Sequence, residues 1–131
     1  MDARAKARRI LELELRQAIA DGGLEVYYQP VVNLGDGKVS SCEALLRWRH
    51  PERGMISPGE FIPVAEETGQ INQLGNWVLH AACAEAANWP EHVRVAVNVS
   101  PIQFKSQTLA LNVAAALAAS GLAATARARD H

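Results

Sequence analysis

The segment from Val93 to Val99 constrains the fold of this chain more than any other stretch. It reads VRVAVNV, which is almost wholly apolar, and such runs are typical of strands buried on both faces of a parallel sheet. Neighbouring parallel strands have to be joined by a crossover, which is usually a helix. The segment therefore predicts an α/β fold in which helices cover the sheet.

Helices and strands alternate along the rest of the chain, as an α/β fold requires. The predicted helices cover residues 2–21, 58–68, 71–89 and 107–120, and the predicted strands cover residues 24–33, 39–48 and 93–99. The turn at Gly35–Gly37 is short, so the first two strands should form an antiparallel hairpin or reach each other directly. The sequence Ser57–Glu60 (SPGE) predicts a capping box, in which the Ser57 hydroxyl accepts from the Glu60 amide.

Size and composition limit the classes of function. The 131 residues suffice for one domain with its own core, and 49% of them are hydrophobic. The net charge of -1 predicts no electrostatic attraction to a nucleic-acid polymer or to an acidic membrane. Cys42 and Cys83 lack metal or redox spacing, so both should be reduced core thiols. We find no signal peptide and no apolar run long enough to span a membrane, and we therefore expect a cytoplasmic protein.

Four polar residues on the predicted strands form the candidate site. In the strand 39–48, alternation places Glu43 and Arg47 on one face. Gln29 and Asn98 lie at or near the carboxyl ends of the other two strands, which is where sites form in α/β folds. The oxygens of Glu43 and Asn98 suit Mg²⁺, Mn²⁺ or Ca²⁺. The Arg47 guanidinium offers a bidentate fork for a phosphate.

Each of these residues also has a purely structural interpretation. Glu43 and Arg47 can form a salt bridge along their own strand. Asn98 can be a turn former ahead of a helix cap, and Gln29 can be a satisfied polar group beside Pro30. Spacing alone leaves these alternatives open.

Four ordered motifs make the chain similar to a known family. They are Tyr28–Val32 (YQPVV), Glu43–Trp48 (EALLRW), Phe61–Gly69 (FIPVAEETG) and Val97–Ser100 (VNVS). Together they resemble the EAL domain family, the cyclic-di-GMP phosphodiesterases named for the Glu-Ala-Leu signature, over about residues 15–121. The resemblance implies a TIM-like (β/α)8 barrel with one antiparallel strand. This chain would be about the first half of that barrel, preceded by an N-terminal helix.

The same resemblance assigns roles to the candidate residues. It implies that Glu43 and Asn98 are ligands of the catalytic divalent metals, Mg²⁺ or Mn²⁺. It implies that Gln29 and Arg47 contact cyclic-di-GMP. In the family, metal-activated water attacks one phosphodiester and yields linear pGpG, which matches the general logic of two-metal hydrolysis.

The end of the chain departs from the family pattern. We interpret residues 1–14 as an N-terminal helical or linker segment, residues 15–123 as a truncated EAL domain and residues 124–131 as a non-family tail without a strand pattern. A TIM barrel needs about 250 residues, and the family's later acidic strands are missing, with the Lys and Glu that complete the metal site. Glu43 and Asn98 are too few ligands for two metals, so we expect no catalysis by this chain alone.

Two other functions stay open beside catalysis. One is a degenerate EAL module that binds cyclic-di-GMP or a partner protein without hydrolysis, and the other is a non-functional gene fragment. Half a barrel also leaves strand edges unpaired, and residues 93–99 should lie at or near such an edge. This predicts marginal stability and self-association through the exposed barrel edge.

The tail allows a test on the DNA. Codons for Ala126–His131 (ARARDH), read from the second nucleotide, are compatible with Leu-Glu-Leu-Glu-Ile-Thr, an acidic strand of the kind that the family has here. We therefore predict a frameshift just before Ala126. Sequencing the gene decides it, because the second frame must then encode the remaining barrel downstream. If it does not, the tail is a coincidence, since each partly specified codon permits several residues.

Overall fold

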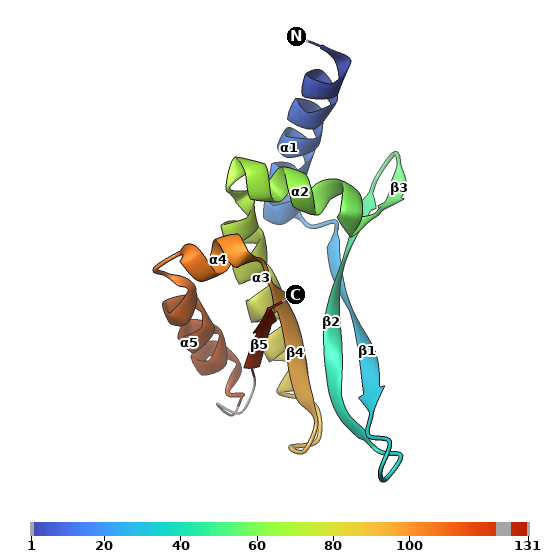
Figure 1. The fold of residues 1–131 in the computed structure, drawn as a ribbon, viewed down its shortest axis with the longest axis vertical. Helices are drawn as coiled ribbons and strands as arrows, with labels where there is room; N and C mark the ends of the chain where they lie inside the picture. The colour runs from blue at the N-terminus through green and yellow to red at the C-terminus, as the bar shows by residue number, and fades with distance from the viewer. Residues whose placement is uncertain (1, 123–126, 131) are drawn as a thin grey trace.

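Helices and strands alternate along the chain, as the sequence predicts (Figure 1). A computed structural model describes residues 2–122 and 127–130. Its elements are α1 (Ala3–Asp21), β1 (Leu24–Val32), β2 (Val39–His50), β3 (Gly54–Ile56), α2 (Pro58–Thr68), α3 (Gln70–Ala86), β4 (Arg94–Val99), α4 (Pro101–Lys105), α5 (Leu109–Ser120) and β5 (Arg127–Asp130).

One mixed sheet links the strands. Its order is β1-β2-β4-β5, and β3 pairs with β2 beside this path. β1 and β2 are antiparallel, which confirms the predicted hairpin, while β4 runs parallel to both β2 and β5. The chain is therefore an α/β fold in which β2, β4 and β5 are parallel and β1 and the short β3 are antiparallel to β2. β4 lies one strand in from the edge of the sheet that the described residues form.

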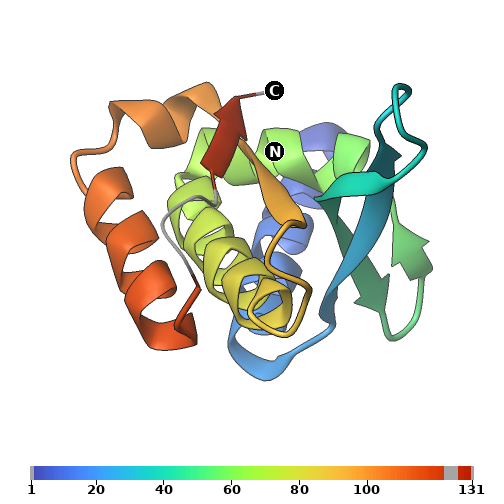
Figure 2. The same ribbon diagram turned by 90° about the horizontal axis from the view of Figure 1, so that it is seen from below.

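α3 and α5 pack on one face of this sheet (Figure 2). Ala44 of β2 and Val95 and Val97 of β4 are buried against α3 and α5. A second cluster joins α1, α2 and the distal part of β2, where the fully buried Trp48 contacts Phe61 edge to face, with ring centroids 5.4 Å apart. The opposite face of the sheet carries the alternate residues of each strand, because side chains alternate along a strand.

The N-terminal helix α1 is attached to the rest of the fold by apolar and polar contacts. Leu11, Leu15 and Ala18 are buried in the core. Three polar contacts reach α1 from elsewhere: Arg8 is paired with Glu67 of α2, His50 Nε2 lies 2.8 Å from Glu14 Oε2, and Gln70 Nε2 donates to the main-chain oxygen of Glu12 at 2.9 Å. α1 runs without a break through the predicted boundary at residue 14, so that boundary stays a prediction. Among the described helices, none is both long and apolar enough to cross a membrane.

Several predicted boundaries and caps differ from the structure. α3 ends at Ala86 rather than residue 89, and the expected helix 107–120 begins at Leu109 and is preceded by the separate helix α4. The short strand β3 is not expected from the sequence. The Ser57 hydroxyl accepts from Gly59 N, because the Glu60 amide donates to the Ser57 main-chain oxygen at 2.9 Å. The Glu60 carboxylate is paired with Arg53 and does not reach back to the cap. A complete capping box forms instead at the start of α4.

The prediction that the tail has no strand is wrong for residues 127–130. They form β5, which pairs in parallel with β4 from Ala96↔Arg127 to Val99↔Asp130. The physical reason is that main-chain N–H and C=O groups along an open strand edge pair with any extended backbone, whatever its side chains. Residues 124–126 and 131 of the predicted tail lie outside the described residues.

The structure predicts an unusual cost for Gly75→Ala. A Cβ at Gly75 would lie 2.5 Å from Cδ of Gln103. Gln103 is buried and its Oε1 accepts from Ser100 N at 3.0 Å, so it cannot move without breaking the cap of α4. Although alanine favours helices, we expect the substitution to lower the free energy of unfolding by about 1–3 kcal/mol. Urea denaturation measures it.

Two further variants test whether the clash with Gln103 causes the loss of stability. At Gly59 a Cβ would be 3.5 Å from Ser57 Oγ, which is an ordinary contact, so Gly59→Ala should have little effect. Combining Gly75→Ala with Gln103→Ala removes the clash, so the double variant should lose less stability than the two single losses added together. Strict additivity would show that Gln103 is not the obstacle.

Candidate functional site

The four candidate residues lie on the sheet face opposite the helices. Ala44 and Leu46 pack against the helical layer, so Glu43 and Arg47 point to the other side by alternation. Gln29 is paired directly with Glu43 across β1 and β2. Asn98 follows Ala96, the partner of Glu43, by two residues. The structure therefore brings residues from three adjacent strands onto one face.

The sequence predicts that the site forms at the carboxyl ends of the strands, and this holds for only some of the four residues. β2 and β4 are parallel, so Arg47 and Asn98 approach the same edge of the sheet from neighbouring strands. β1 is antiparallel to β2, and its carboxyl end at Val32 lies beside Val39 at the start of β2. The expectation that Gln29 shares a carboxyl end with the others is wrong. Gln29 meets Glu43 through cross-strand pairing instead.

The amide oxygen of Asn98 is buried and has no hydrogen-bond partner within the described residues. The interpretation of Asn98 as a turn former is wrong, since it lies inside β4 and the cap of the next helix is Ser100. A buried acceptor without a partner costs about 1–3 kcal/mol. Such orphaned groups in native structures are associated with ligands, ions or strain.

Arg47 has no carboxylate partner among the ion pairs of the described residues, so the intrastrand salt bridge with Glu43 is not formed. Its Nη1 donates to the Leu46 main-chain oxygen at 3.0 Å, and its guanidinium carbon lies 5.6 Å from the centre of the Tyr27 ring. These contacts hold the side chain without neutralising its charge. Arg47 therefore keeps donors for an anion.

Arg49, two residues further along the same strand, behaves differently. Its Nε donates to Glu25 Oε1 at 2.9 Å. This hydrogen bond lowers the pKa of Glu25 and raises the pKa of Arg49. The charge of Arg49 is thus compensated within the fold, which makes it a natural comparison for Arg47.

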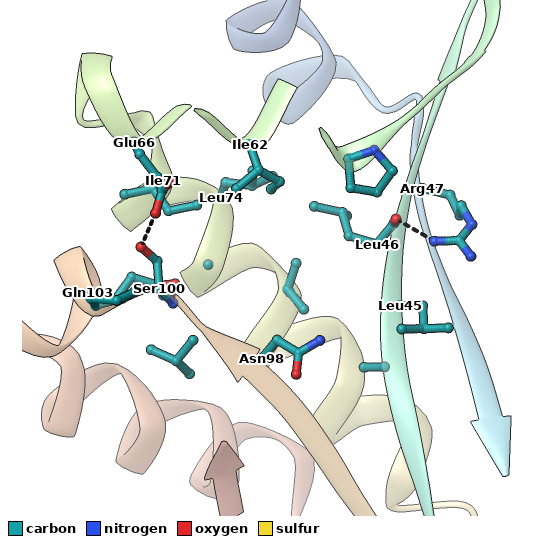
Figure 3. A pocket seen from close by; sticks show the side chains of 16 residues that line it. Leu45, Leu46, Arg47, Ile62, Glu66, Ile71, Leu74, Asn98, Ser100 and Gln103 are labelled. Atoms are coloured by element: carbon teal, nitrogen blue, oxygen red, sulfur yellow. Dashed lines mark hydrogen bonds between the residues drawn. The ribbon is translucent and has the colours of Figure 1, made fainter. Parts of the chain in front are cut away.

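A pocket of about 460 Å³ opens where β2 has no paired strand on one edge (Figure 3). β1 occupies one edge of β2, while the other edge pairs with β4 at residues 41–44 and with β3 at residues 48–50. Residues 45–47 lie between these two ladders and line the pocket. Asn98 lines the facing side, from the end of β4. The recess follows from where the two ladders stop.

The pocket also contains polar residues that the sequence did not single out as site residues. Glu66 Oε2 accepts from the Ser100 hydroxyl at 2.6 Å and joins α2 to the start of α4 (Figure 3). Gln103 lines the pocket from α4. The only sequence signals for them were the Ser-Pro cap at Ser100 and the position of Glu66 in the FIPVAEETG motif. Neither signal places these side chains in a pocket.

The donors present fit half of a metal site. A carboxylate from Glu43 and the unpartnered amide oxygen of Asn98 are the oxygen ligands that Mg²⁺ and Mn²⁺ prefer. Within residues 2–122 and 127–130, however, no three His, Cys, Asp or Glu side chains gather as a metal-binding group. Glu43 and Asn98 can therefore contribute to such a site but do not complete it.

Comparison with known proteins decides the family. The model of the EAL domain matches residues 12–127, which is most of the chain. The chain belongs to the EAL domain family. An uncharacterised protein of Sinorhizobium fredii is 54% identical to this EAL chain over 125 residues, which are 95% of the chain and 15% of that protein.

Two relatives carry functional names. Cyclic di-GMP phosphodiesterase NbdA of Pseudomonas aeruginosa is 45% identical over 118 residues, which are 87% of this EAL chain and 15% of NbdA. The structure of the PaMucR phosphodiesterase in complex with c-di-GMP superposes with a TM-score of 0.82 at 42% identity, over 86% of this chain and 47% of that one. The chain thus spans a small part of its curated relatives and about half of a solved EAL chain, and it has the corresponding part of the TIM-like fold.

The orphaned amide of Asn98 predicts that this EAL chain is more stable without it. Asn98→Leu removes the unpartnered acceptor and keeps a similar volume, so the free energy of unfolding should rise by about 1 kcal/mol. Thermal or urea unfolding measures the change. Asn76→Leu on α3 is the matched control, because Asn76 Oδ1 is also buried without a partner among the described residues but Asn76 does not line the pocket, so a similar gain is expected there. A loss of stability in Asn98→Leu would show that the amide has a partner in solution.

Proposed function

We propose that this chain supplies the first half of a cyclic-di-GMP site and binds the dinucleotide without hydrolysing it when it is alone. The observation that carries the proposal is the buried, unpartnered oxygen of Asn98 on the same sheet face as Glu43 and Arg47. NbdA and PaMucR, whose sequences match this chain closely, are named as phosphodiesterases of this nucleotide. Support thus comes from the geometry and from the relatives independently.

The metal side of the proposed site rests on Glu43 and Asn98. When bound there, Mg²⁺ or Mn²⁺ would polarise a phosphodiester and activate water. Glu43 lies beside Gln29 through cross-strand pairing, and Asn98 lies on the next strand of the sheet. Two oxygen donors are too few to hold two metals in working geometry. Hydrolysis to pGpG therefore requires further carboxylates beyond those that the described residues bring together.

The nucleotide side rests on Arg47 and Gln29. Arg47 lines the pocket, is positioned by Tyr27 and Leu46, and keeps its charge uncompensated. A guanidinium held this way can donate two parallel hydrogen bonds to a phosphate. Gln29 is exposed opposite Glu43 and can donate or accept at the same face.

A cytoplasmic location belongs to the same proposal. Cys42 and Cys83 are both free, as thiols are in reducing compartments. Burial raises the pKa of the Cys83 thiol, which disfavours the reactive thiolate. Both features are consistent with a reducing environment.

Titration of the purified chain with cyclic-di-GMP tests the proposal, with Mg²⁺ or Mn²⁺ present and with pGpG assayed in parallel. We expect binding without pGpG. Arg47→Ala should weaken the binding roughly tenfold to a hundredfold, because charge-assisted hydrogen bonds contribute about 1.5–3 kcal/mol. The double variant Glu25→Ala with Arg49→Ala is the matched control, because it removes the neighbouring ion pair without leaving a free carboxylate opposite Arg47, and it should bind like the wild type.

Two results would contradict this function. Equal binding by the wild type and the Arg47→Ala variant would show that Arg47 is not a ligand contact. Formation of pGpG that is abolished by Glu43→Ala would show that the chain completes a catalytic site, contrary to the number of donors in the described residues.

A further inference from the structure

Helix α1 carries a second stripe of residues that the fold does not use. Its buried stripe is Leu11, Leu15 and Ala18. Ile10 and Leu13, in contrast, are 48% and 44% exposed, although both are large and apolar. At 3.6 residues per turn Ile10 lies about 80–140° and Leu13 about 140–160° round the helix from the three buried residues. Packing within the monomer therefore does not explain them.

The exposed stripe has the spacing of a coiled coil. Steps of three and four residues connect its members, with Ile10 at an a position and Leu13 at a d position, and every member is exposed. The a positions are Ala3, Ile10 and Gln17, and the d positions are Lys6, Leu13 and Ala20. β-Branched residues at a with leucine at d favour two parallel strands. Polar residues at the outer positions weaken such a pair but restrict its register.

The flanking charges are complementary in a parallel pair. With this assignment Arg9 and Arg16 fall at g positions, and Glu14 and Asp21 fall at e positions. In parallel dimers a g residue faces the e residue five positions later on the partner. Arg9 then faces Glu14 of the partner, and Arg16 faces Asp21 of the partner. Both contacts join opposite charges, and symmetry repeats each of them.

The surroundings of α1 leave this stripe accessible. The N-terminal part of α1 extends beyond the other elements (Figure 1). The contacts that fix α1 to the fold do not use the a and d positions: Arg8 is paired with Glu67, Gln70 reaches the main chain of Glu12, and His50 contacts the e-position Glu14 through Oε2. Arg9 and Arg16 each contact Glu12 of their own helix, at 3.1 and 3.5 Å, but both arginines are more than half exposed, and exposed ion pairs of this kind exchange partners at little cost. We infer that α1 forms a weak parallel two-stranded coiled coil with α1 of a second copy of this chain.

Sedimentation equilibrium of the whole chain across a wide concentration range tests this inference. We expect a reversible dimer, and Ile10→Ser combined with Leu13→Ser should weaken it at least about tenfold. Leu111→Ser is the control, because Leu111 is 70% exposed on α5 and lies outside the stripe. Its dimerisation should match that of the wild type. Circular dichroism shows that each variant is folded.

Charge exchange tests the register directly. Arg16→Glu places two acidic residues opposite each other, and Asp21→Arg places two basic ones, so each variant should dimerise several times more weakly than the wild type. Mixing the two variants restores opposite charges at both contacts, so heterodimers should form in preference to either homodimer. Equal association of the mixture and the separate variants would overturn the proposed register.

Disulfide crosslinking tests whether the two α1 helices are parallel. In a parallel pair each a residue faces its own copy, so Gln17→Cys should form a disulfide-linked dimer under mild oxidation. Arg4→Cys, outside the stripe, should not crosslink beyond the wild-type level. A monomer at every concentration would overturn the inference. So would a dimer that is unaffected by Ile10 and Leu13, since association would then use another surface, such as the open sheet edge.

Discussion

The main-chain pairing of β2 with its neighbours is the constraint on which the site depends. β1 pairs antiparallel along one edge, and β4 and β3 divide the other edge between them. This register decides that Gln29, Glu43 and Asn98 share a face and that Ala44 and the β4 valines face the helices. A one-residue slip would exchange the two faces completely, because side chains alternate. The burial of the apolar residues against α3 and α5 therefore also holds the polar ones in place.

Much of this arrangement could be predicted from the sequence, because strong local signals agree with it. The apolar strand at residues 94–99, the glycine turn before Val39 and the proline that begins α2 placed most elements within a few residues. The family motifs supplied what spacing left open for Glu43 and Asn98. Local signals failed where pairing decides the structure: β3 has only three residues, and β5 forms on β4 without a strand-like sequence.

The candidate site, like the fold, could be predicted from the sequence only in part. Which residues carry polar chemistry was evident from the sequence, and the face of Glu43 and Arg47 followed from alternation. The orphaned oxygen of Asn98 and the freedom of Arg47 from a salt bridge depend on what surrounds each atom, which no spacing reveals. Glu66 entered the pocket through its contact with Ser100, which joins elements that are 34 positions apart in sequence. Long-range contacts of this kind are invisible to periodicity.

The recess beside residues 45–47 is shaped by where the strands separate rather than by side chains, because β4 continues to Val99 but pairs with β2 only as far as Val97. Replacing its lining residues alters which molecules fit, but the opening persists as long as the ladders of β4 and β3 stop where they do. The ligand that the recess prefers and the sheet that forms the recess can therefore change independently. Side-chain changes at the rim can retune the preferred ligand over evolutionary time, whereas the recess closes only if β4 stays paired with β2 beyond Val97, which changes the sheet itself.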